Sequence, residues 1–106
     1  MAKNLKKIGF NEAGSIRKAT INVAGYEPFD ITYKIPGNAA RIAILVMMQS
    51  DEAKIGNAAL DFIVEHMTAW TLPELISRES LNQLDNDRVF YEIFKTIKEA
   101  GESRKN

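Results

Sequence analysis

Cysteine is absent from the 106 residues, and histidine and tryptophan each occur once, as His66 and Trp70. Without cysteine the chain cannot form a disulfide framework, a zinc–thiolate site or a thiol nucleophile. A metal site built on two histidines is excluded as well, because only one histidine is present. The lack of cysteine also fits a reducing compartment, so we expect a cytoplasmic protein.

Long apolar segments are absent too. The longest apolar run, residues 42–48, is far shorter than the roughly 18 residues that a membrane-spanning helix requires. The basic residues Lys3, Lys6 and Lys7 are not followed by the apolar core of a secretory signal. We therefore expect neither a membrane partner nor secretion.

The composition of the chain indicates one folded domain in which charge is unevenly distributed along the sequence. Hydrophobic residues make up 45 % and charged residues 26 % of the chain, which is ordinary for a globular domain of this length. Residues 1–20 carry five basic groups against one acidic group, a net charge of +4, whereas residues 21–100 carry −5. Nucleic-acid binding needs concentrated positive charge, so we expect no such partner. We interpret residues 1–17 as a basic, flexible arm, 18–100 as the domain and 101–106 as a frayed tail.

Alternation of apolar and polar residues predicts β structure in residues 18–35. Phe29, Ile31 and Tyr33 alternate with polar neighbours, which places them on one face of a strand. Residues 24–28 contain glycine and proline and are short enough for a hairpin loop. Since an isolated hairpin is only marginally stable in water, we expect it to pack on helices.

Three- and four-residue spacing of apolar side chains predicts helices in the rest of the chain. Residues 39–50 are apolar on most faces, so we expect this helix to be the most buried. Residues 59–70 predict an amphipathic helix that ends with Trp70, shortly before Pro73.

Two further helices are predicted after Pro73. Ser77 or Ser80 can cap a short helix by accepting a backbone N–H. Residues 85–87 offer a cap with acidic charge for a last helix, which Gly101 ends. Together the elements predict an α+β fold, with an N-terminal β-hairpin packed on a bundle of three to four helices.

Candidate catalytic and metal-binding groups are sparse. His66 falls on the apolar side of its predicted helix, so we interpret it as a structural histidine rather than a base. Asp61 and Glu65, and likewise Asp85 and Asp87, could bind a cation, but a solvated helix face and a helix cap explain the two pairs better. We therefore predict no enzyme, no metal and no cofactor.

Large apolar residues are the better candidates for function. A tryptophan buries roughly 200 Å², so Trp70 is either a core anchor or a contact residue for a partner. The last helix has apolar residues on more than one face, which raises the same question for Phe90, Tyr91 and Phe94. We take these four as candidate partner-binding residues.

The order of short motifs gives the chain a resemblance to a known family. A hairpin that ends in residues 29–33 leads to a segment closing on Ala-Trp-Thr-Leu at 69–72, then to a connector with Ser-Leu-Asn-Gln-Leu at 80–84. A last helix follows around Val-Phe-Tyr-Glu-Ile at 89–93. Over residues 29–99 this order resembles the small tail assembly chaperones of long-tailed bacteriophages.

The resemblance implies a function for the chain. Such chaperones are non-enzymatic proteins of the host cytoplasm that are absent from the finished virion. They coat the tape-measure protein, help recruit tail-tube subunits and often form homo-oligomers, and many are extended by a programmed ribosomal frameshift. By this resemblance, the expected partners are the tape-measure protein and the tail-tube protein.

Two other binding functions compete with this interpretation. Residues 71–99 have the length of a helix-turn-helix DNA-binding regulator. The supposed recognition helix, however, carries Asp85, Asp87 and Glu92, whose charges would repel phosphate. A small antitoxin or inhibitor is the third interpretation.

Overall fold

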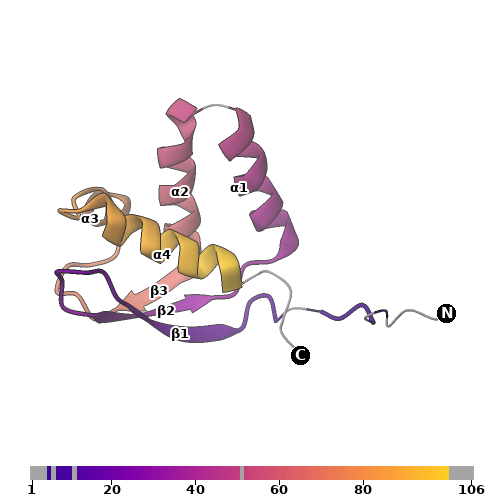
Figure 1. The fold of residues 1–106 in the computed structure, drawn as a ribbon, viewed down its shortest axis with the longest axis horizontal. Helices are drawn as coiled ribbons and strands as arrows, with labels where there is room; N and C mark the ends of the chain where they lie inside the picture. Colours follow the sequence, from indigo (N-terminus) through magenta and orange to yellow (C-terminus); the bar gives the residue numbers. More distant parts are fainter. Residues whose placement is uncertain (1–4, 6, 11, 51, 101–106) are drawn as a thin grey trace.

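The computed structural model describes residues 5, 7–10, 12–50 and 52–100. Their helices and strands are β1 (Ile16–Ile21), β2 (Phe29–Lys34), α1 (Asn38–Ser50), α2 (Glu52–His66), β3 (Met67–Trp70), α3 (Arg78–Asn82) and α4 (Asp87–Ala100). The strands form one antiparallel sheet in the order β1-β2-β3. All the helices lie on the same side of this sheet (Figure 1). The predicted α+β fold is confirmed, and the hairpin is part of a three-stranded sheet.

The β1–β2 hairpin follows the predicted alternation. The strands pair from Ile16 opposite Lys34 to Ile21 opposite Phe29. The connecting loop contains Gly25 at φ 91°, a left-handed conformation that glycine adopts without steric cost. On the face toward the helices, Ile21 and Ile31 are at most 2 % exposed.

The sheet begins earlier than the sequence indicated. β1 starts at Ile16, so the predicted boundary at residue 17 between arm and domain falls inside a strand. Just before β1, the Gly14 N–H donates to the Ile35 carbonyl at 2.8 Å and ties the chain to the sheet. Of the arm, residues 1–4, 6 and 11 lie outside the described residues, as does the whole predicted tail 101–106.

β3 is the element that helical spacing missed. α2 ends at His66, and the next four residues form β3, which pairs with β2 with Met67 opposite Tyr33 and Trp70 opposite Ile31. The predicted helix through Trp70 is therefore wrong in its last turn. The edge of β2 offers unpaired backbone groups that a strand satisfies, and threonine and tryptophan favour β structure. Over four residues, apolar spacing alone does not distinguish the two structures.

α1 differs most from expectation. Only Ile44, at 6 % exposed, is buried among its described side chains, whereas Ile42 and Val46 are 57 % and 58 % exposed. The prediction that this helix would be the most buried is wrong. α1 packs mainly on α2, and the α1–α2 hairpin stands off the sheet, so one side of α1 is covered and the other is not (Figure 1).

The core lies between the sheet, the lower part of α2 and α4. α4 places every third or fourth residue against the sheet and α2, which is the amphipathic pattern expected for it. Side chains that are fully buried there come from all layers: Ile21, Ile31, Ile63, Leu81, Ile93 and Ile97. Within the described part of the chain, no helix combines the length and apolar character needed to span a bilayer.

Candidate functional site

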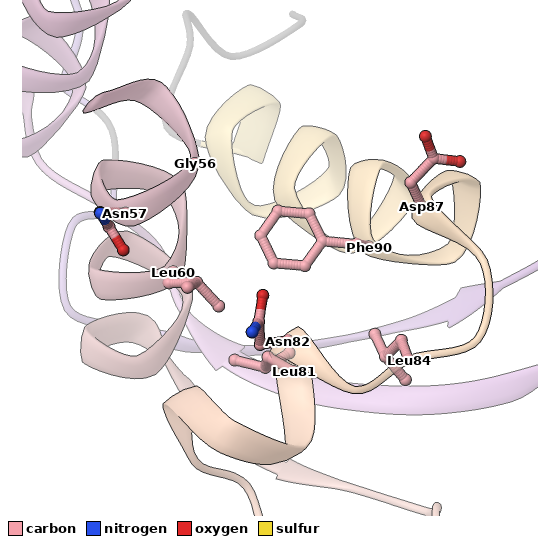
Figure 2. Close-up of a pocket in the computed structure, with 8 residues that line it drawn as sticks. All are labelled: Gly56, Asn57, Leu60, Leu81, Asn82, Leu84, Asp87 and Phe90. Carbon is pink, nitrogen blue, oxygen red and sulfur yellow. The ribbon is translucent and has the colours of Figure 1, made fainter. Parts of the chain in front are cut away.

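Phe90 projects from α4 into a groove bounded by α2, α3 and α4. Figure 2 shows its ring between the helices, pointing toward Leu60 on α2. The groove has a volume of ≈ 360 Å³, within the range of ligand-binding clefts. Its lining is mixed but has an apolar floor: Gly56, Asn57, Leu60, Leu81, Asn82, Leu84, Asp87 and Phe90. We call it the Phe90 groove.

Local capping positions α3 as one wall of the Phe90 groove. The Ser77 Oγ accepts from the Ser80 N–H at 3.0 Å, and the Ser80 Oγ accepts from the Ser77 N–H at 2.9 Å. This reciprocal capping satisfies two backbone donors at the helix start. Of the two caps that the sequence left open, Ser77 is the N-cap, and Ser80 completes the capping box. The capped helix buries Leu81, which is 1 % exposed, beneath the groove.

Arg78 connects this wall to α2. Its guanidinium forms an ion pair with Asp61, and its Nη2 donates to the Asn57 Oδ1 at 3.0 Å. Asn57 lines the groove, so Arg78 holds α3 and the α2 side of the groove together. The interaction also occupies Asp61, one of the carboxylates considered for a cation.

Trp70 borders a second hollow that adjoins the first. This hollow has a volume of ≈ 390 Å³ and is lined by Trp70, Leu72, Pro73, Glu74, Ser80, Gln83, Leu84 and Asp85. Leu84 lines both hollows, so the hollows beside Trp70 and Phe90 are neighbours on the surface. The indole Nε1–H donates to the Glu74 carbonyl at 2.6 Å, which satisfies its single polar group. We call the two hollows together the Trp70–Phe90 surface.

Carboxylates predominate among the charges beside the Trp70–Phe90 surface, and the Arg78 guanidinium lies next to it, bound to the lining residue Asn57. Among the described residues that line it, the ionisable groups are the carboxylates of Glu74, Asp85 and Asp87, and no lysine or arginine takes part. Apolar hollows beside carboxylates favour a partner whose apolar side chains are flanked by basic ones.

The structure separates the four candidate residues of the sequence. Trp70 and Phe90 are half-buried on the same surface. Tyr91 follows Phe90 and is 57 % exposed on the outside of α4. Phe94 is 5 % exposed and packs edge-to-face on Phe62 with ring centroids 5.6 Å apart, so it presents little area to a partner.

His66 is buried on the apolar side of α2, where the helical spacing of the sequence placed it. The residue is 8 % exposed, and its Nδ1 lies 2.8 Å from the Phe62 carbonyl. A carbonyl only accepts, so Nδ1 carries the proton of this hydrogen bond. Across the described ranges, no group of three or more histidine, aspartate or glutamate residues is arranged to hold a metal ion.

One surface was missed by sequence reasoning. Ile42, Leu45 and Val46 are 57 %, 43 % and 58 % exposed and follow one another along α1 at helical spacing. The signal was present, since residues 39–50 are apolar on most faces. That pattern predicts a buried helix, but it fits equally a helix that is covered by protein on one side only.

Comparisons of the chain with protein-family models, with curated proteins and with solved structures found no match. Function is therefore inferred from these surfaces and from the order of motifs in the sequence.

Proposed function

We propose that this chain is a non-enzymatic, protein-binding tail assembly chaperone of a long-tailed bacteriophage. It would hold helical segments of the tape-measure protein in the host cytoplasm and help recruit tail-tube subunits. The order of motifs over residues 29–99 supports this proposal.

The observation that carries the proposal is the Trp70–Phe90 surface. Two half-buried aromatic residues border neighbouring hollows of ≈ 360 and ≈ 390 Å³ that share Leu84 in their linings. Aromatic residues at the centre of an apolar depression are the residues that most often dominate binding energy in protein interfaces. An amphipathic helix can place side chains at i, i+3 or i+4 into adjacent hollows of this kind.

The carboxylates beside the two hollows favour a positively charged partner. Glu74, Asp85 and Asp87 would attract lysine or arginine on either side of the apolar residues of a bound helix. An amphipathic tape-measure segment with basic residues beside its apolar stripe is therefore the expected client.

Trp70 supplies a direct experiment, because it is the single tryptophan of the chain. A tryptophan-free helical fragment of the tape-measure protein from the same phage or prophage is titrated into the protein while Trp70 emission is recorded. We expect a saturable change in emission, together with a complex in sedimentation velocity, at micromolar concentration.

Three variants test whether the Trp70–Phe90 surface is the binding site for the tape-measure fragment. Phe90→Ala removes the ring from the groove, and Tyr91→Ala removes an exposed contact without disturbing the core. We expect at least a tenfold loss of affinity for Phe90→Ala, as for a central contact residue, and a smaller loss for Tyr91→Ala. Ile16→Ala, at a side chain 59 % exposed on β1, is the control and should bind like the wild type. Absence of any complex, or equal affinity for all four proteins, would contradict the proposal.

A further inference from the structure

Gly56 lies inside α2 at a position where neither packing nor backbone conformation requires a glycine. The residue is exposed in the second turn of the helix, and glycine weakens a helix interior relative to alanine. A Cβ placed on Gly56 would meet no heavy atom of the described chain within 4 Å. Its φ is not positive either, because the positive-φ glycines among the described residues are Gly14 and Gly25. The described part of the fold therefore gives no reason for glycine at this position.

The open space beside Gly56 belongs to the Phe90 groove. Gly56 and Leu60 are four residues apart on α2, so they share one face of the helix, and both line the groove. Figure 2 shows Gly56 at the α2 side of the groove and the Phe90 ring across from it. The missing side chain at position 56 therefore leaves a hole between α2 and Phe90, in which the backbone of α2 is accessible.

A hole of this kind fits a large apolar side chain from a partner helix. Where two helices pack closely, a side chain of one inserts into a hole formed by residues of the other. Glycine lets the inserted side chain rest directly on the helix backbone. Leu60 and Phe90 then supply apolar contact on either side of it. A small side chain such as alanine would leave the hole unfilled and lose these contacts.

Asp87 sets the charge beside the inserted side chain. It is exposed in the first turn of α4 and lines the same groove. Within the described ranges no ion pair involves Asp87, whereas Arg78, which lies next to the groove, is paired with Asp61. A lysine or arginine of the partner, next to the inserted apolar residue, therefore meets a complementary charge at Asp87.

We infer that the Phe90 groove receives a large apolar side chain of the client helix directly against Gly56, with a basic residue of the client beside Asp87. Gly56 is then a specificity-determining residue, which selects clients with leucine, methionine or phenylalanine at the inserted position. This inference rests on the proposed function, because the client is the helical tape-measure segment. It adds the point at which the client helix crosses α2.

Opposite effects on stability and binding test the inference. Gly56→Ala favours the helix, so the equilibrium constant for unfolding should fall about two- to fivefold. The same methyl group occupies part of the hole, so the dissociation constant of the tape-measure fragment should rise about fivefold or more. Gly56→Leu fills the hole further and should weaken binding more than Gly56→Ala does, again without loss of stability. Urea denaturation and the titration of Trp70 emission measure the two quantities.

Gly9 provides a matched control outside the groove. A Cβ on Gly9 also meets nothing within 4 Å, so Gly9→Ala and Gly9→Leu should bind and unfold like the wild type. If the wild type binds the fragment and Gly56→Leu binds equally well, the inference is overturned and the proposed function stands. A loss of stability in Gly56→Ala, or an equal loss of affinity in the Gly9 variants, overturns the inference as well.

An alanine scan of the large apolar residues in the fragment identifies the inserted side chain. One alanine variant of the fragment should bind the wild type more weakly, and its loss should be smaller with Gly56→Leu, which has already removed the contact. Additive losses at every position overturn the inference. If the wild type binds no fragment, the inference and the proposed function both fail. If it instead binds the apolar dye anilinonaphthalene sulfonate, and Gly56→Leu abolishes that signal, the groove takes a small molecule and the inference is overturned.

Discussion

Ile93 and Tyr91 lie two positions apart on α4 and meet opposite surroundings. Ile93 is 0 % exposed between the sheet and α2, whereas Tyr91 is 57 % exposed. Truncation of a buried isoleucine removes apolar contacts and leaves a cavity, so Ile93→Ala should lower the free energy of unfolding by about 2–5 kcal/mol. Tyr91→Ala should change it by only about 0.5 kcal/mol. Urea denaturation measures both, and a similar loss for the two variants would argue against the described register of α4.

The buried Tyr33 makes the free energy of unfolding depend on pH in the alkaline range. Burial raises the pKa of Tyr33 above its ordinary value of 10.0, and the charge of Arg17, its partner across the strands, opposes this shift. The unfolded chain therefore loses its phenolic proton before the folded chain does. The stabilising contribution is complete below about pH 10 and is lost as the pH rises through the folded pKa.

Replacement of Tyr33 by phenylalanine should remove this contribution. The free energy of unfolding of Tyr33→Phe, measured in urea at pH 8 to 11, should fall less steeply with pH than that of the wild type. Tyr91→Phe makes the same substitution at an exposed position of α4 and is the control for the exchange itself. Equal slopes for the wild type and Tyr33→Phe would show that the buried phenol does not control alkaline unfolding.

Single residues were predictable from the sequence where one local pattern decided the outcome. The apolar alternation in 29–33 placed Ile31 and Tyr33 in the core, and the helical spacing placed His66 on an apolar face. Trp70 and Phe94 were not separable in this way, because a large apolar residue satisfies a core and an interface equally well. Only the packing of α4 on α2 decided that Phe94 is buried and that Phe90 borders a groove.

At the scale of elements, α3 is a five-residue helix that depends on its cap. So short a helix has little stability of its own. Ser77→Ala removes the acceptor for the Ser80 N–H and should cost about 0.5–2 kcal/mol of the free energy of unfolding. The substitution should also weaken client binding, since α3 forms a wall of the Phe90 groove.

A matched variant distinguishes the loss of the Ser77 cap from the effect that any alanine substitution in α3 has on stability. Glu79→Ala changes an exposed residue of the same helix and should cost less than Ser77→Ala in the same urea experiment. A loss as large for Glu79→Ala would mean that the reciprocal serine capping does not stabilise α3.

The elements that were mispredicted share a physical cause. β3 and α1 are both determined by what lies next to them in space, not by their own periodicity. Met67–Trp70 becomes a strand because β2 has an open edge, and α1 stays exposed because it packs mainly on α2. The cap of α3 was predictable, since Ser77 and Ser80 are neighbours in the chain.

At the scale of the whole molecule, the sheet, α2 and α4 form one core, and the functional surfaces lie outside it. The Trp70–Phe90 surface carries the carboxylates of Glu74, Asp85 and Asp87, whereas residues 38–50 of α1 contain Arg41 as their single charged residue. Charge complementarity therefore gives the Trp70–Phe90 surface a means of selecting its partner that the exposed apolar side of α1 lacks.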